Sequence, residues 1–367
     1  MRVKYYNIDK EFQRSYKKFN KNFLDFKKTG NLLLGKHLNN FEKKLSNILG
    51  SKHVLGVANG TDALELSIKS LNPPNNSEII TTSNTFVSTV NAIINVGCKP
   101  VFADIDTNYN IDPNKIENHI NKKTFAIMPV HLNGLPACMN KIRKISKKYN
   151  LHIIEDAAQS ILSTYHGKYI GNQKNLACFS MHPTKNLGVL GDGGFISTNN
   201  TSLFKKIKLL RNHGLKDGKS IIVGRNSRLN EINSLVAYLR LDFLKKDTLI
   251  KQKIANFYNQ NLTSDIITPK NDCCRDNTHT YHRYVVRVPK RDKLIKYLIE
   301  NNIEVKVHYP KNIHEYKIFK RYLKNNKNLS NTLKFSKEIL SLPCNHFMSI
   351  KHAEFVVNKI NRYYESS

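Results

Sequence analysis

The chain has 367 residues, 40% of them hydrophobic and 24% charged, which is typical of a globular protein with one large domain and a smaller one. Its apolar runs are shorter than the ~20 residues of a transmembrane helix, and its N-terminus lacks the apolar core of a signal peptide, so we predict a cytoplasmic protein without membrane association. The formal charge of +31 is spread along the chain, as in residues 141–148 and 324–327, which argues against nucleic-acid binding. This charge either covers the surface generally or helps to attract a diphosphate-bearing substrate.

The N-terminal part predicts helices and a strand that leads to a phosphate site. Residues 1–30 carry aromatic side chains at helical spacing and are expected to pack on their own domain. A helix at 41–49 and a strand at 53–57 follow, and the strand runs through Gly60 and Thr61 into the next helical pattern. Free backbone N–H groups and a hydroxyl at a helix N-terminus bind phosphate, although an ordinary helix cap is the alternative.

The next segments alternate strands with helices, which indicates a doubly wound α/β domain. The expected strands are residues 79–82, 101–105 and 124–130, and the expected helices are residues 84–95 and 138–149.

An acidic residue follows the next strand. Residues 151–154 are apolar and predict a buried parallel strand with Asp156 at its carboxyl end, where open α/β sheets bind ligands. The alternative role of Asp156 is that of a helix cap. Lys185 lies about thirty residues further on, near the glycine-rich turn at 191–194. Together they offer what pyridoxal phosphate requires, an amine for the Schiff base and a carboxylate for the pyridinium nitrogen.

The remaining pattern completes this domain and predicts a smaller one. We place the large domain at residues 1–245 and the small domain at 246–367. The expected elements are a hairpin at 163–170, strands at 177–180, 195–198, 281–288 and 303–307, an amphipathic helix from 232, a basic helix from about 245, and a helix at 294–301.

Short motifs occur in order along nearly the whole chain. They lie at residues 34–35 (LG), 60–64 (GTDAL), 85–87 (TFV), 130–132 (VHL), 155–159 (EDAAQ), 183–187 (PTKNL), 224–229 (GRNSRL), 308–310 (HYP) and 340–343 (LSLP). In these motifs the chain resembles the DegT/DnrJ/EryC1/StrS family, the fold-type-I, pyridoxal-phosphate-dependent aminotransferases that act on nucleotide-linked keto sugars. The resemblance implies a large doubly wound α/β/α domain and a smaller C-terminal α+β domain.

The resemblance also implies a set of cofactor contacts. Phe86 would stack on the cofactor ring, Gln159 would bind its phenolic oxygen, and Ser180 would bind its phosphate. A plain core phenylalanine and a serine bonded to backbone are the alternatives for Phe86 and Ser180. Asn226 would reach the cofactor phosphate of the other subunit, which implies a homodimer with shared active sites. The full set is Gly60, Thr61, Phe86, Asp156, Gln159, Ser180, Lys185 and Asn226.

Substrate residues follow from the same resemblance. His308, Tyr309 and His314 match the pattern that lines the sugar side of the cleft. Arg228 either neutralises an anion or anchors its loop through an ion pair. Lys185 would act as general acid and base, with L-glutamate as amino donor. The motifs at 224–229 and 308–310 look more like the branch that aminates the 3-keto group of dTDP-6-deoxyhexoses, for O-antigen and lipopolysaccharide, than like the 4-keto branch.

Three other functions remain open at this stage. Related dehydratases carry histidine at the Schiff-base position, whereas this chain has Lys185. A non-catalytic, cofactor-binding regulator and a basic nucleic-acid-binding protein are the other two. The six cysteines include the adjacent pair Cys273 and Cys274 but no CxxC, so we expect neither a disulfide framework nor a metal site.

Overall fold

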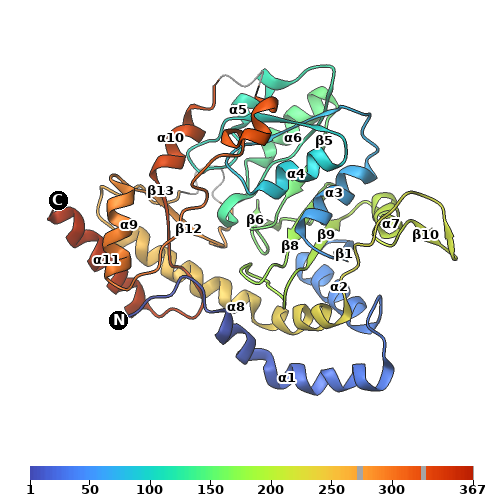
Figure 1. Ribbon diagram of the computed structural model, residues 1–367, viewed down its shortest axis with the longest axis horizontal. Helices are drawn as coiled ribbons and strands as arrows, with labels where there is room; N and C mark the ends of the chain where they lie inside the picture. Colours follow the sequence, from blue (N-terminus) through green and yellow to red (C-terminus); the bar gives the residue numbers. More distant parts are fainter. Residues whose placement is uncertain (271–275, 324–327, 367) are drawn as a thin grey trace.

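The larger part of the chain is built on one mixed sheet (Figure 1). The computed structural model describes residues 1–270, 276–323 and 328–366, and within these ranges the sheet has the order β1-β9-β8-β5-β4-β2-β3. The last five strands in this order are parallel, while β9 runs antiparallel to both β1 and β8. The strands are β1 (His53–Val57), β2 (Glu78–Thr82), β3 (Lys99–Ala103), β4 (Thr124–Ile127), β5 (His152–Asp156), β8 (Leu176–Ser180) and β9 (Gly194–Thr198).

Helices cover both faces of this sheet, as expected from the alternating pattern. One face packs against apolar residues of α2 (Lys36–Leu49), α6 (Met139–Tyr149) and α8 (Glu231–Asn261). The other face packs against α3 (Gly60–Ser70), α4 (Val87–Asn95) and α7 (Thr201–Leu210). The predicted large α/β/α domain is therefore confirmed, and its parallel strands direct their carboxyl ends to one edge.

The C-terminal elements form a second core at the left of Figure 1. This core combines the end of α8 with α9 (Arg291–Glu300), α11 (Ile350–Glu365) and the antiparallel pair β12 (Tyr284–Arg287) and β13 (Ile339–Leu342). One continuous α8 replaces the two helices expected around residue 245, and it runs from the large sheet to this core. The division at residues 245 and 246 stays a prediction.

One predicted strand does not form. Residues 303–307 make only isolated bridges, Ile303 to Val3 and Lys306 to Ser341, in the described part of the chain. Each end of the segment meets a different neighbour, so no continuous ladder forms.

The predicted hairpin at 163–170 is confirmed by β6 (Thr164–Tyr165) and β7 (Lys168–Tyr169). The remaining elements are α5 (Pro113–Ile116), η1 (Glu117–His119), η2 (Leu132–Gly134), β10 (Leu215–Lys216), β11 (Lys219–Ser220), η3 (Ile313–Glu315), η4 (Lys317–Tyr322) and α10 (Ser330–Glu338).

Cysteine usage differs from the expectation at one position. Cys138 is disulfide-bonded, which the sequence did not predict, because cysteine spacing does not show which cysteines the fold brings together. Cys98, Cys178 and Cys344 are free and buried. The pair Cys273 and Cys274 and the run 324–327 lie outside the described residues. Within the described residues, none of the helices combines the length and apolarity that crossing a membrane requires.

The N-terminal helix α1 (Ile8–Thr29) packs against α8, as the aromatic spacing predicted. The chain then turns through Gly35 into α2, and Glu231 at the start of α8 contacts this turn. The Glu231 carboxylate is 1% exposed and accepts hydrogen bonds from the backbone N–H groups of Gly35, His37 and Leu38. These are N-terminal donors that the helix itself leaves unpaired.

We expect Glu231→Ala to lower the free energy of unfolding by about 3 kcal/mol, because it leaves buried N–H groups without an acceptor. Chemical denaturation monitored by circular dichroism measures this loss. Glu300→Ala, at an exposed position on α9, is the control and should change the free energy of unfolding little. Equal stability of the two variants would contradict the role of Glu231.

Candidate active site

Three predicted residues meet where strands end. Asp156 ends β5, Ser180 ends β8, and Gly60 begins α3 directly after β1. A Cβ atom at Gly60 would lie 2.8 Å from Cβ of Ser180, so only glycine lets these two chain segments approach this closely. Thr61 follows in the first turn of α3. The edge of the sheet thus brings a helix N-terminus, two hydroxyl side chains and a carboxylate together.

Asp156 is buried, and its carboxylate accepts two hydrogen bonds. Its Oδ2 accepts from the Thr89 hydroxyl at 2.7 Å, and its Oδ1 accepts from the Ala158 N–H at 3.2 Å. Burial raises the pKa of this carboxyl, while the two hydrogen bonds and the nearby Lys185 charge act in the opposite direction. Thr89 was not predicted as a site residue, although it lies one helical turn beyond Phe86.

A buried histidine and glutamate stand behind this strand end. The His131 Nδ1 atom accepts from the Ala137 N–H at 3.0 Å, so its Nε2 carries the proton and donates to Glu155 at 3.0 Å. Although burial alone would raise it, hydrogen bonds from His131 and Asn175 hold the pKa of the Glu155 carboxyl below its usual range. This pair fixes the VHL and EDAAQ segments against each other.

Lys185 lies on the loop between β8 and β9. Burial of its amine lowers the pKa from 10.5 to about 7, Arg283 acts in the same direction, and Asp156 acts against both. Lys185 and Asp156 are therefore close enough to change each other's protonation, as predicted from the sequence. The loop is tight, because a Cβ atom at Gly188 would lie 2.5 Å from the Pro183 carbonyl oxygen.

Helix α8 holds this loop from behind. Lys251 Nζ donates to Asn186 Oδ1 at 2.8 Å, Arg240 donates to the Gly188 carbonyl, and Asn233 donates to the Asp192 carbonyl at 3.0 Å. All three contacts lie on the C-terminal side of Lys185, and together they restrict the path of the loop that carries it. These α8 residues were not predicted, because they are more than forty residues away in the sequence.

Gln159 and Tyr309 connect the two parts of the protein. Gln159 accepts from the Asn133 N–H at 2.8 Å and donates to the Tyr309 hydroxyl at 3.2 Å. Arg283 also donates to this hydroxyl, at 3.0 Å. The Phe86 and Tyr309 ring centroids are 6.0 Å apart, and 52% of Phe86 is exposed, so Phe86 is not a core phenylalanine. The structure therefore brings Phe86, Gln159 and Tyr309 together.

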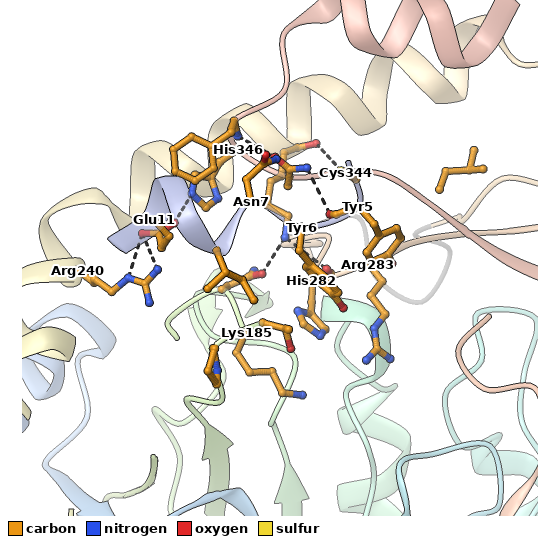
Figure 2. Close-up of a pocket in the computed structure, with 18 residues that line it drawn as sticks. Tyr5, Tyr6, Asn7, Glu11, Lys185, Arg240, His282, Arg283, Cys344 and His346 are labelled. Atoms are coloured by element: carbon orange, nitrogen blue, oxygen red, sulfur yellow. Dashed lines mark hydrogen bonds and ion pairs between the residues drawn. The ribbon is translucent and has the colours of Figure 1, made fainter. Parts of the chain in front are cut away.

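Lys185 lines a pocket that also contains the N-terminal segment (Figure 2). Tyr5 and Tyr6 enter it from one side, and His282 and Arg283 from the segment before β12. Burial lowers the pKa of the His282 imidazole well below its usual range, and the neighbouring Lys185 charge adds to this effect, so the ring is neutral.

An ion-pair network fastens α1 beside this pocket. Glu11 forms an ion pair with Arg240 and a hydrogen bond with His346, and Asp247 forms an ion pair with Arg14, as Figure 2 shows in part. Burial lowers the pKa of the His346 imidazole to about 4, so this ring is neutral. Ligand atoms of Glu11, Asp247 and His346 lie within 4.8 Å of one another. Each carboxylate already binds an arginine, and this explains the cluster as a fastening of α1 to the rest of the chain.

Of the predicted site residues, only Lys185 lines this pocket in the described part of the chain, and the other predicted residues lie outside its lining. Asn226 is exposed, and its Oδ1 accepts from Arg228 at 3.1 Å. Arg228 also donates to Asn212 Oδ1 at 3.2 Å, so it anchors its loop through amide oxygens. His308 binds Ser341 at 2.9 Å, and His314 is buried against Ser83 at 2.6 Å. Cofactor contact by Asn226 and sugar contacts by both histidines remain predictions.

The residues present fit pyridoxal phosphate. An amine with a lowered pKa, on the half-buried Lys185, suits bonding to an aldehyde, and the buried Asp156 carboxylate suits a ring nitrogen. The close approach of Gly60 and Ser180 suits a phosphate at the N-terminus of α3. In the described part of the chain, both ring nitrogens of His282 and Nε of Arg283 are buried without hydrogen-bond partners, as expected of atoms that a bound molecule satisfies.

Comparison with known proteins identifies the family. Residues 13–361 match the model of the DegT/DnrJ/EryC1/StrS aminotransferase family. The chain belongs to this family. It is therefore a pyridoxal-phosphate-dependent aminotransferase, as predicted.

Individual relatives agree along the whole chain. A Geobacillus stearothermophilus protein named pleiotropic regulatory protein is 36% identical over 343 residues, 92% of each chain. An Aneurinibacillus thermoaerophilus protein named dTDP-3-amino-3,6-dideoxy-alpha-D-galactopyranose transaminase is 37% identical over 337 residues, 91% of this chain and 92% of that protein. The crystal structure of DesV from S. venezuelae superimposes with a TM-score of 0.95 at 29% identity, covering 99% of each chain.

The lowered pKa of Lys185 predicts how cofactor capture depends on pH. Only a neutral amine attacks an aldehyde. Because its pKa is about 7, half of the Lys185 amine is neutral near pH 7. We therefore expect the rate at which the cofactor-free aminotransferase captures pyridoxal phosphate to rise with pH below 7 and to level off above it. Absorbance kinetics measure this rate, with free acetyl-lysine as the control. A rate that kept rising toward pH 10 would indicate an ordinary lysine.

Proposed function

We propose that this aminotransferase transfers the amino group of L-glutamate to a nucleotide-linked keto sugar. The observation that carries the proposal is the half-buried Lys185, whose loop α8 holds and whose amine lies within electrostatic reach of Asp156. The A. thermoaerophilus relative, named for a dTDP-sugar with an amino group at C3, supports the 3-keto position over the 4-keto position. The proposed substrate is a dTDP-3-keto-6-deoxyhexose.

The chain's own residues have defined roles in this reaction. When bound, pyridoxal phosphate supplies an aldehyde that condenses with amines and a ring that accepts electrons. Lys185 would hold it covalently and, once free as a neutral amine, would take the proton from the donor's alpha carbon. Asp156 keeps a proton on the ring nitrogen, Gln159 donates to the phenolic oxygen, and Gly60, Thr61 and Ser180 bind the phosphate.

An absorbance spectrum of the purified protein tests the amino donor. The holoenzyme should be yellow, and L-glutamate should bleach it. The acceptor test supplies dTDP-4-keto-6-deoxyglucose, glutamate and a 3,4-ketoisomerase, and we expect nitrogen at C3 of the product by NMR. Product without the isomerase, with nitrogen at C4, would show that the position is wrong while the aminotransferase assignment stands. A protein that glutamate does not bleach and that forms no amino sugar would favour the regulator that the name of the G. stearothermophilus relative suggests.

We also propose a homodimer with shared sites. Asn226 lies outside its own subunit's pocket, in the loop before α8, and Leu33 of the preceding segment forms a bridge with Asn230 of this loop. Leu32 and Leu33 are 50% and 48% exposed, which makes this region a suitable apolar interface. Location in the cytoplasm and a role in O-antigen and lipopolysaccharide synthesis stay predictions.

Subunit mixing is expected to restore activity. A Lys185→Ala subunit supplies an intact Asn226, and an Asn226→Ala subunit supplies an intact Lys185, so each mixed dimer has one complete site. Equal mixing with free exchange should give about a quarter of wild-type activity, because half of the dimers are mixed and each has one of two sites intact. Coupled activity assays before and after exchange measure it. No recovery, with mixed dimers verified by mass spectrometry, would contradict shared sites.

A further inference from the structure

Arg283 occupies a position in the pocket that catalysis as described above does not use. It directly precedes β12, and only 8% of its surface is exposed. Its Nη1 donates to the Tyr309 hydroxyl at 3.0 Å, and its Cζ lies 5.2 Å from the centroid of the Tyr309 ring. Figure 2 shows the Arg283 side chain extending from the pocket lining in the same general direction as Lys185. Its charge also acts on the Lys185 amine.

This guanidinium has no acidic partner among the residues that the structure describes. Its Nε is buried without a hydrogen-bond partner, and the groups that act on its charge are the hydroxyls of Tyr5, Tyr6 and Tyr309. Lys251 adds a further buried cation in the same pocket. A buried cation without a counterion is costly to maintain. Such an arrangement is expected where a bound anion supplies the missing charge.

The shape of the free donors indicates the kind of anion. Tyr309 takes Nη1, which leaves the edge formed by Nε and Nη2, and this planar pair of donors matches the two oxygens of a carboxylate. The cofactor phosphate has its own proposed site at Gly60, Thr61 and Ser180. A carboxylate that is separated from the reacting carbon by few bonds can lie beside Lys185. The diphosphate of a nucleotide sugar is separated from that carbon by more bonds.

We propose that Arg283 is the carboxylate-binding residue of the active site and that it selects acidic substrates. The proposal rests on the aminotransferase function proposed above. Two substrates can supply the carboxylate: the amino donor L-glutamate, or a sugar that carries an acid group. Tyr309 positions the guanidinium from one side and contacts Gln159 on the other, so the occupied anion site is coupled to the cofactor side of the pocket.

Wild-type holoenzyme gives the first test. Glutarate lacks an amine and cannot react, and glutaramide has nearly the same shape without charge. We expect glutarate to bind at least about tenfold more tightly than glutaramide by titration calorimetry, because hydrogen bonds to charged groups are the stronger ones. UDP-glucuronate and UDP-glucose form the matching pair for the sugar. The proposal is overturned if neither acid binds more tightly than its uncharged partner.

Variants then assign the preference to Arg283. Arg283→Leu should weaken binding of the preferred acid about 10- to 100-fold, and Arg283→Lys should weaken it less, because it keeps the charge but not the fork. Loss of glutarate and L-glutamate binding identifies the amino donor as the source, and loss of UDP-glucuronate binding alone identifies the sugar. Arg362→Leu, which removes an exposed arginine of α11, is the matched control and should leave the acid preference unchanged.

Two results of this series would overturn the proposal. One is unchanged acid preference in Arg283→Leu, and the other is an equal loss in Arg362→Leu, which would make the loss an effect of net charge. If Arg283→Leu fails to fold, the wild-type pairs together with Arg283→Lys decide the question. Bleaching of the wild-type holoenzyme by L-glutamate separates the two proposals, since a bleached enzyme without acid preference refutes only the role of Arg283.

Discussion

Lys185→Ala is expected to reduce turnover by at least ~10²–10⁴-fold while leaving the fold intact, because it removes the covalent link and the acid–base group together. The loop around residue 185 should keep its shape in this variant. Lys251, Arg240 and Asn233 hold the loop through Asn186 and two backbone carbonyls, and none of these contacts involves the Lys185 side chain. The variant should therefore still bind pyridoxal phosphate, but reversibly.

Two measurements separate loss of chemistry from loss of structure. Dialysis should remove the cofactor from Lys185→Ala and not from the wild type, while the circular dichroism spectra of the cofactor-free proteins should agree. Lys174→Ala changes an exposed lysine in the segment before β8 and should retain full activity. Near wild-type transamination by Lys185→Ala would refute the assignment of the catalytic lysine.

Local patterns predicted the parts of the fold that local sequence determines. Apolar runs of four to five residues became the parallel strands, and their carboxyl ends placed Asp156 and Ser180 at one edge, as expected of an open α/β sheet. Residues 303–307 alternate apolar and charged side chains, which is also a strand pattern, but they form no continuous ladder, because pairing depends on partners that the pattern does not specify. The continuous α8 was also missed, since its basic second half differs in composition from its apolar first half.

The site could be predicted where a residue type has one demanding role. A lysine followed by a glycine-rich turn and an aspartate at a strand end are sufficient to suggest the cofactor. Arg283 and Lys251 gave no such signal, because the chain has 59 basic residues and most of them are solvated. What distinguishes these two is burial, and for Arg283 also the lack of an acidic partner among the described residues, which the packing of α8 and β12 against the large sheet creates.

Asp156→Asn is expected to reduce turnover by ~10²–10⁴-fold, because a neutral amide cannot hold a proton on the ring nitrogen. The amide keeps the shape of the side chain. Its oxygen can replace Oδ1 and accept from the Ala158 N–H, while its NH2 group takes the place of Oδ2 and can donate to the Thr89 hydroxyl oxygen, so the fold should persist. The variant also removes the acid that opposes the low pKa of Lys185, so capture of pyridoxal phosphate should level off at lower pH than in wild type.

Single-turnover bleaching by L-glutamate and the pH profile of capture measure the two effects separately. Thr89→Val, which removes one hydrogen bond to Asp156 but not its charge, is the matched control and should cost less. If Asp156→Asn bleached as fast as the wild type, the carboxylate would have no electronic role, and Asp156 would only cap the turn that follows β5.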